Sequence, residues 1–305
     1  MKNRFRLAPR NHLTKTYLKL VKSSGLLFVI IALLSGCANT SSVLTATKIS
    51  TSQPASTITA TRTETQLPTE IPILTSTATA TPVFVNQPCS PLEGIRLAEL
   101  PQLMTGDVFN PPAPGRDDGH HGVDFAFYRH GNLTTMEGLP VQAILDGRVA
   151  AVIDNLKPYG NAIIIETPLE TLSQQWNTTI NLPALAPTVL PDPRLTCPVE
   201  PEQPWMASSQ RSLYHLYAHL KEMPVVNVDE SVTCGQVIGE VGTTGNSINP
   251  HLHLETRIGP AGATFSGLGH YDPRLSNEDR SNYCTWRVSN WFQMFDPMKI
   301  LAQHP

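Results

Sequence analysis

The chain has 305 residues, enough for one large domain or two small ones once any targeting segment is removed. Its formal net charge of −3 gives no basis for nucleic-acid binding, which normally appears as a clustered basic surface. The apolar fraction of 40% is ordinary for a globular protein, whereas the 27 prolines concentrate before the folded region and in connections between predicted strands. Composition therefore predicts a folded domain and excludes a nucleic-acid partner.

Residues 1–37 have the pattern of an export signal. A lysine- and arginine-rich start precedes an apolar run from Leu26 to Leu34, which is far shorter than the roughly 20 residues of a membrane-spanning helix. Ser35, Gly36 and Cys37 follow, and this ending resembles the lipobox of bacterial lipoproteins, whose cysteine is acylated after cleavage. We expect an exported protein of the cell envelope, anchored to a membrane through Cys37. A plain secretory signal with a chance cysteine is the alternative.

Residues 38–87 are dominated by Ser, Thr, Pro and Ala. Such a segment cannot bury enough apolar surface to offset its ordering entropy, so we expect a disordered linker. It would tether a domain over residues 88–305 to the membrane.

Four cysteines remain in the predicted domain: Cys89, Cys197, Cys234 and Cys284. An even number in an exported domain predicts two disulfides, with three possible pairings. A cysteine-based zinc site is the competing interpretation. It is disfavoured because no two of these residues have the C-x-x-C spacing.

Short β-rich runs bounded by Gly, Pro, Asn and Asp follow Cys89. They are residues 123–128, 141–145, 148–153, 162–166, 213–219, 237–241 and 251–256. This texture predicts a mostly β fold, an antiparallel β-sandwich or partly open barrel. Two stretches interrupt it, residues 168–210 and 258–290. Both are expected to be long loop insertions.

The segment His251-Leu252-His253-Leu254-Glu255 places two histidines two residues apart. In a strand such residues point to the same face, with Cα atoms about 6.6 Å apart. His251 and His253 would then face one site, and the two leucines would pack behind it. Two histidines on a solvated strand face are the simpler interpretation of this pattern alone.

His120 and Asp124 form an H-x-x-x-D motif that leads into a predicted strand. Positions four apart in a straight strand lie about 13 Å apart and could not share a metal ion. A bend near Gly122 is therefore required, and glycine permits it. The neighbouring His121 is expected at the surface or behind the ligands.

In the segment 214–219, strand alternation places His215, Tyr217 and His219 on one face. His219 could then meet His251 across a cleft, while Tyr217 could assist or simply pack. His215 is expected to be a partly exposed strand residue.

These motifs occur in an order that resembles the lysostaphin-type (LytM) zinc peptidases, which have the duplicated hybrid motif fold. The resemblance covers about residues 115–301, apart from the two insertions. Further segments that support the resemblance are Ala143-Ile144-Leu145-Asp146-Gly147-Arg148-Val149, Tyr159-Gly160-Asn161, the glycine-rich run 235–247 and the closing segment 296–301.

The resemblance implies a role for each matching residue. His120, Asp124 and His253 would ligate Zn²⁺, leaving a position for water. His219 and His251 would act as general base and general acid or stabilise the developing oxyanion. The family cleaves peptide bonds in the stem peptides or cross-bridges of bacterial peptidoglycan, so peptidoglycan is the expected partner.

Two non-enzymatic functions remain as alternatives. Some members of this fold have lost their ligands and serve as regulators that activate cell-wall amidases, but every ligand and both accessory histidines are present here. A peptidoglycan-binding module displayed on a stalk would explain the linker and the β-domain. It would leave the histidines and the aspartate without a purpose. The sequence indicates no particular protein partner.

Overall fold

The computed structural model of the chain describes residues 87–104, 108–172, 182–183, 187–199 and 201–302. The predicted export signal with Cys37, and the linker up to residue 86, lie outside these residues. Among the helices that the structure describes, none is long and apolar enough to cross a bilayer.

Most of the regular secondary structure in the described part of the chain is β-strand. These are β1 (Val123–Phe125), β2 (Pro140–Gln142), β3 (Gly147–Leu156), β4 (Gly160–Pro168), β5 (Arg211–Leu220), β6 (Ser231–Val232), β7 (Val237–Glu240), β8 (Leu252–Pro260) and β9 (Gln293–Phe295). The α-helices are α1 (Leu100–Leu103), α3 (Asn277–Arg287) and α4 (Met298–Leu301).

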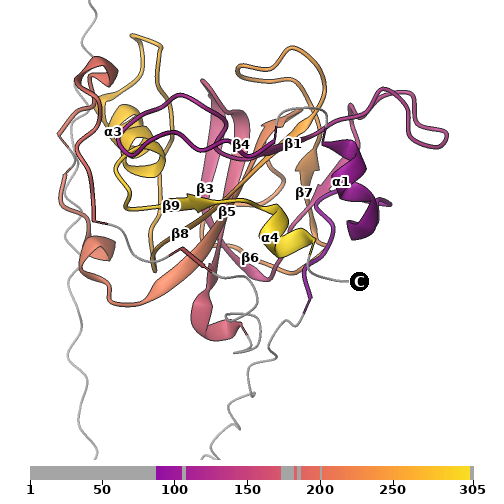
Figure 1. Cartoon of the computed structure of the whole chain (residues 1–305), viewed down its shortest axis with the longest axis horizontal. Coiled ribbons are helices and arrows are strands. Elements are labelled where there is room, and N and C mark those ends of the chain that lie inside the picture. The colour runs from indigo at the N-terminus through magenta and orange to yellow at the C-terminus, as the bar shows by residue number, and fades with distance from the viewer. Residues whose placement is uncertain (1–86, 105–107, 173–181, 184–186, 200, 303–305) are drawn as a thin grey trace, which may run out of the picture. The chain divides into compact units, whose positions relative to one another are not determined.

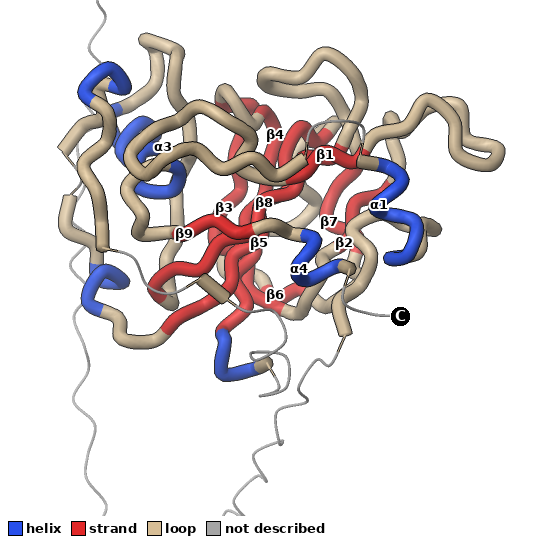
Figure 2. The backbone as a smooth tube through the Cα atoms, in the orientation of Figure 1, coloured by secondary structure: helices blue, strands red, loops and turns tan. Residues whose placement is uncertain are grey.

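The strands form a seven-stranded antiparallel sheet with the order β1-β8-β5-β4-β3-β6, to which β9 adds by pairing with β8. A second, two-stranded sheet pairs β2 with β7. Figures 1 and 2 show the long strands β3, β4, β5 and β8 crossing the centre of the molecule. The predicted mostly antiparallel β fold is confirmed.

The main sheet is covered on both faces. Along β5, Leu213 and Tyr217 belong to an apolar core shared with residues of β2, β7 and helices α1 and α4. Tyr214 and Leu216 face the opposite side and pack with aromatic residues of α3 and its flanking loops, such as Trp286. Alternate residues of one strand thus enter different cores, which explains why β4, β5 and β8 are buried almost throughout.

The prediction that residues 258–290 form a loop insertion is wrong in part. β8 continues to Pro260, and the eleven-residue helix α3 occupies residues 277–287. Ser276 begins the helix in a capping box: its Oγ accepts from the Asp279 amide, and the Asp279 carboxylate accepts from the Ser276 amide. The described residues of the insertion at 168–210 contain only short 3₁₀ turns after β4.

The predicted pair of disulfides is present, and the structure gives the pairing. Cys89 is bonded to Cys234, and Cys197 is bonded to Cys284. The second bond ties the first insertion to α3 in the second insertion. No cysteine of the predicted domain is left to form a zinc site.

Candidate active site

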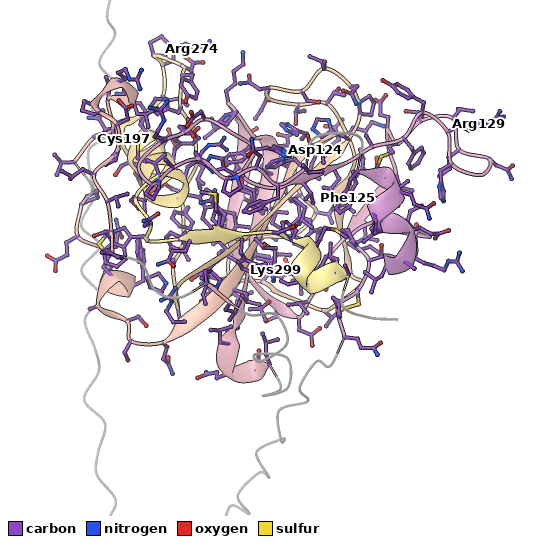
Figure 3. The ribbon with its side chains drawn as sticks, in the orientation of Figure 1. Asp124, Phe125, Arg129, Cys197, Arg274 and Lys299 are labelled. Atoms are coloured by element: carbon purple, nitrogen blue, oxygen red, sulfur yellow. A yellow bond between two sulfur atoms is a disulfide. The ribbon has the colours of Figure 1, made fainter. Side chains whose placement is uncertain are left out.

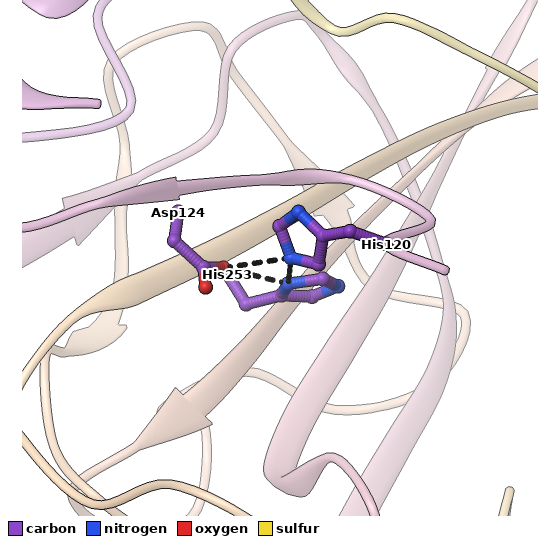
Figure 4. A group of neighbouring side chains, drawn as sticks. All are labelled: His120, Asp124 and His253. Atoms are coloured by element: carbon purple, nitrogen blue, oxygen red, sulfur yellow. Dashed lines mark hydrogen bonds and ion pairs between the residues drawn. The ribbon is translucent and has the colours of Figure 1, made fainter. Parts of the chain in front are cut away.

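His120, Asp124 and His253 converge on one point (Figure 4). Asp124 Oδ1 lies 3.2 Å from His120 Nε2 and 2.8 Å from His253 Nδ1. The two imidazole nitrogens are 3.1 Å apart. Asp124 on β1 is the direct cross-strand partner of His253 on β8, so the strand register itself places the carboxylate beside the second imidazole.

Two glycines bring His120 to this point. Gly119 has a φ of +81°, which lets the chain turn so that His120 forms an isolated antiparallel β-bridge with Asn110. At Gly122, a Cβ atom would lie 2.2 Å from the backbone oxygen of Leu254. Gly122 is thus needed because β1 and β8 approach closely there. The predicted bend is present, and His120 and Asp124 meet despite their spacing of four.

The imidazoles of His120 and His253 each have a second partner that orients the ring. His120 Nδ1 lies 3.1 Å from the carbonyl oxygen of Val108, and His253 Nε2 lies 3.2 Å from Glu255 Oε1. Such partners fix the tautomer of a ligating histidine and increase its basicity. The nitrogens that face Asp124 are therefore the ones available to an ion.

The charges of this cluster are strongly coupled. Burial disfavours the charged form of His253, but the hydrogen bonds and charges of Asp124 and Glu255 outweigh burial and raise the pKa of His253 to about 9. Burial would raise the pKa of Asp124. The hydrogen bonds from His120 and His253 instead hold it well below its usual range. An anionic carboxylate thus sits between two nitrogen donors.

His219 and His251 lie beside this group, with ring centroids 4.7 Å apart. His219 has a φ of +62°, which breaks the alternation of β5 and turns its ring toward His253, with centroids 5.8 Å apart. The predicted common face of His215, Tyr217 and His219 is therefore wrong. The predicted meeting of His219 with His251 is confirmed.

Each of these two histidines has its Nδ1 engaged by a backbone carbonyl. His219 Nδ1 lies 2.8 Å from Thr244 O, and His251 Nδ1 lies 2.8 Å from Asn249 O. Burial lowers the pKa of His219 to about 3, with further contributions from the charges of His253 and His251. His219 is therefore neutral at pH 7, with Nδ1 as the donor, and its Nε2 has no hydrogen-bond partner among the described residues.

All five residues line a cleft of about 600 Å³. Residues 126–128 and 134–135 form one side, and residues 246–250 form another. Tyr128 and Ile248 in these stretches are exposed by 87% and 100%, so the cleft has two exposed large apolar side chains in its lining. A larger hollow of about 1080 Å³ lies beside the Cys197–Cys284 disulfide and contains none of the five residues.

Three other sequence predictions have clear outcomes. His121 is buried rather than on the surface, and its Nδ1 lies 2.9 Å from Arg257 Nη2 behind the cluster. His215 is fully buried, so the prediction of partial exposure is wrong. Tyr217 simply packs: it is buried in the core, and its hydroxyl accepts a hydrogen bond from the Ile144 amide.

Sequence reasoning did not identify the buried residues behind His253. Glu255 accepts hydrogen bonds from the Tyr159 hydroxyl (2.8 Å), the Trp286 indole (3.0 Å) and the Arg257 guanidinium (2.7 Å). The spacing of Glu255 two residues after His253 was a usable signal, because both point to one strand face. Trp286 comes from α3, far away in sequence, and no local pattern predicts that contact.

The cluster has the donor set that divalent zinc prefers. Two imidazole nitrogens and one carboxylate oxygen, all within 4.8 Å of one another, match the three protein ligands of catalytic zinc sites, which leave one position open. Hydrogen bonds to Val108 O and Glu255 supply the outer partners that such ligands need. The residues therefore fit a metal ion.

Comparisons with known proteins find a family match and several similar proteins. Residues 205–264 match the model of peptidase family M23. DD-carboxypeptidase/endopeptidase Mpg of Neisseria meningitidis serogroup B and its counterpart in Neisseria gonorrhoeae are each 37% identical over 68 residues, which is 22% of this chain. The chain spans only 15% of the length of these relatives.

Solved structures of similar proteins include the catalytic domain of lysostaphin from Staphylococcus simulans, with 21% identity over 68% of this chain and 98% of that chain and a TM-score of 0.35. A zinc-containing peptidase from Vibrio cholerae is 23% identical over 50% of this chain and 32% of that chain, with a TM-score of 0.27. The segment that matches the family model contains His219, His251 and His253. The resemblance to lysostaphin-type (LytM) peptidases seen in the sequence is thus supported by a family match over residues 205–264.

Proposed function

We propose that this protein is a zinc-dependent endopeptidase that cleaves peptide bonds in the stem peptides or cross-bridges of peptidoglycan. One observation carries the proposal: three ligating atoms of His120, Asp124 and His253 meet in an open cleft beside two further histidines. The family match supports a peptidase, and the name of the Neisseria relatives, DD-carboxypeptidase/endopeptidase, supports a peptide substrate.

His120 Nε2, Asp124 Oδ1 and His253 Nδ1 would hold the ion. A zinc ion bound there would lower the pKa of a bound water toward about 7 and polarise the scissile carbonyl. His219 is suited to accept a proton, because its Nδ1 is held by Thr244 O and its Nε2 is free. His251, held in the same way by Asn249 O, would donate a proton to the leaving amine or stabilise negative charge on the carbonyl oxygen.

The proposed location follows from the start of the chain. Cleavage before Cys37 and acylation of that cysteine would anchor the protein to a membrane at its extracytoplasmic side. The linker up to residue 87 would let the domain reach peptidoglycan at a distance. The two disulfides are consistent with an oxidising compartment outside the cytoplasm.

The test combines metal analysis with digestion. We expect about one zinc ion per chain by elemental analysis, and soluble peptide fragments when purified peptidoglycan is incubated with the protein. Removal of zinc by a chelator should stop the release, and added zinc should restore it. Mass analysis of the fragments identifies the bond that is cut.

Two outcomes would replace this proposal. Bound zinc without cleavage of several peptidoglycan types would favour a regulator that activates a cell-wall amidase. Binding to peptidoglycan that survives replacement of both His120 and His253, again without cleavage, would favour a wall-binding module.

A further inference from the structure

One arginine that belongs to none of the predicted motifs lines the cleft. Arg287 is the last residue of α3 and lines the cleft together with Tyr159 and His253. Among the described residues that line the cleft, no other is an arginine or a lysine. The second insertion therefore supplies the cleft with a fixed positive charge.

The surrounding residues hold the guanidinium of Arg287 in one position. Its Nε donates to the buried carboxylate of Asp117, which lies three residues before His120. Its Nη1 donates to the Tyr159 hydroxyl at 3.2 Å and lies 3.5 Å from Glu255 Oε1. The guanidinium carbon also lies 5.8 Å from the ring centroids of both Tyr159 and Tyr283. Little conformational entropy would be lost if this group bound a ligand.

One edge of the guanidinium is not used by the protein. Nε and Nη1 have the partners just described, whereas Nη2 has no hydrogen-bond partner among the described residues. Arg287 Nη2 is not one of the buried atoms without a partner, so it is accessible to solvent. The Arg287 side chain keeps 13% of its area exposed. A planar group with free N–H donors at a cleft wall matches a carboxylate in shape and charge.

We propose that Arg287 binds a carboxylate of the peptide substrate, close to the bond that is cleaved. This inference rests on the proposed peptidase function. Arg287 Nη1 lies near Glu255 Oε1, which in turn contacts His253 Nε2, the ring nitrogen opposite the metal-facing Nδ1. Arg287 would therefore bind a group that flanks the scissile bond rather than the scissile carbonyl. The neighbouring Asp117 and Glu255 already offset part of its charge. A singly charged carboxylate is thus better matched than a doubly charged phosphate.

Two sources within peptidoglycan peptides supply such a carboxylate. One is the terminal carboxylate of a stem peptide, and the other is the free carboxylate of the diamino acid at a cross-link. Two matched pairs of synthetic peptides separate them. The first pair is a D-Ala-D-Ala-terminated stem peptide with a free or an amidated C-terminus. The second is a cross-linked peptide dimer whose diamino acid carries a carboxylate or a carboxamide.

The experiment measures binding and cleavage separately. Binding is measured by calorimetry on the zinc-loaded full chain carrying His219→Ala, so that the peptides are consumed far more slowly, and cleavage is measured with the unchanged protein. We expect the carboxylate member of at least one pair to bind about 10- to 100-fold more tightly than its amide, the range of a charge-assisted hydrogen-bonded pair. The pair that shows the preference identifies the source.

Variants test whether Arg287 causes the preference. Arg287→Gln should reduce it to less than about 3-fold, because the amide side chain carries no charge. Arg287→Lys should retain only part of it, because an ammonium cannot hold Asp117 and present a planar pair of donors together. Arg274→Gln is the matched control: this arginine lies in the same insertion, is paired with Asp272 and does not line the cleft (Figure 3).

A second variant is the control for an effect of the substitution on folding. Arg287→Gln leaves the Asp117 carboxylate without its cation, so Asp117→Asn with Arg287→Gln is made as well to keep the buried pair neutral. Equal binding of carboxylate and amide in both pairs, or no binding of any peptide, would overturn the inference. So would a preference that survives both Arg287→Gln variants. A carboxylate preference without cleavage would refute the peptidase proposal alone, whereas cleavage without preference would refute only the role of Arg287.

Discussion

A single carboxylate oxygen organises the candidate metal centre. Asp124 Oδ1 contacts both His120 and His253, and its other oxygen lies 3.6 Å from His251 Nε2. The position of Asp124 depends on the β1–β8 register, so Asp124 and His253 are held by the sheet itself rather than by a loop. Sites on strands keep their geometry better than sites on loops.

The ligands and the accessory histidines should respond differently to substitution. We expect His253→Ala and Asp124→Ala to lose zinc and to abolish peptidoglycan cleavage. His219→Ala and His251→Ala should keep most of their zinc while turnover falls by about 10²- to 10⁴-fold, the usual contribution of acid–base groups. Elemental analysis beside a digestion assay measures both quantities. Loss of metal in the His219 variant with retention in the His253 variant would show that the assignment is reversed.

His215 should make the folded state sensitive to acid. Burial lowers its pKa to about 3, and neither ring nitrogen has a hydrogen-bond partner among the described residues. An unfolded histidine titrates near pH 6.5. Between these values the unfolded chain binds a proton that the folded chain does not, so stability falls as the pH falls from about 6.5 toward 3.

His215→Leu removes the titrating imidazole and replaces it with an apolar side chain of similar size. We expect the free energy of unfolding to decline less steeply with acid in the variant, by up to about 1.4 kcal/mol per pH unit. Urea denaturation of both proteins at several pH values between 7 and 4.5 measures the two slopes. Identical slopes would show that His215 is not held neutral in the folded state.

At the scale of elements, the strands were predictable and the helix was not. The β-rich composition and bounding turn residues of seven sequence runs predicted strands β1–β5, β7 and β8, although several bounds differ by a few residues. Helix α3 was missed because its apolar side chains are few, and its core contacts come from Tyr283, Cys284 and Trp286. The Ser276 capping box was a usable signal for its start.

The candidate site was predictable where one element supplies the geometry. Strand alternation placed His251 and His253 correctly, with Leu252 and Leu254 in the core behind them. It failed at His219, because a positive φ at a residue other than glycine cannot be read from a local pattern. Contacts such as Arg287 with Asp117 join residues 170 positions apart and depend on the whole fold.

The close contact of β1 with β8 at Gly122 is a further test of how the elements build the site. In Gly122→Ala the new methyl group would meet backbone atoms of Leu254, which cannot rotate away. We expect a loss of stability of about 1–3 kcal/mol, as for other overpacked sites, and weaker zinc binding because Asp124 moves relative to His253.

Gly239→Ala in β7 is the matched control for this substitution. Its Cβ would contact only the side chain of Leu220, at 3.1 Å, which can adjust. Thermal unfolding and zinc titration of the two variants make the comparison. Equal losses in both would mean that the Gly122 contact does not fix the metal centre.

At the scale of the whole molecule, the two disulfides link segments that the sheet does not. Cys89–Cys234 joins the start of the domain to the turn before β7 across 145 residues. Cys197–Cys284 joins the two insertions across 87 residues and fixes α3, which carries Arg287 at its end. The Cys197–Cys284 bond therefore helps to hold α3, and with it Arg287, in place beside the cleft.

The two bonds should contribute similarly to stability but differently to function. In the chain-entropy model, closing loops of these lengths stabilises the folded state by about 4–5 kcal/mol each, with less than the sum for both because the loops overlap. We expect Cys89→Ala/Cys234→Ala and Cys197→Ala/Cys284→Ala each to lower the urea midpoint markedly. Only the second pair should also weaken the carboxylate preference, because α3 loses its covalent tie while the sheet and metal ligands stay in place. Urea denaturation measures the change in stability, and the matched peptide pairs measure the carboxylate preference. An unchanged preference after loss of Cys197–Cys284 would show that the contacts of Arg287 with Asp117 and Tyr159 hold the guanidinium without the disulfide.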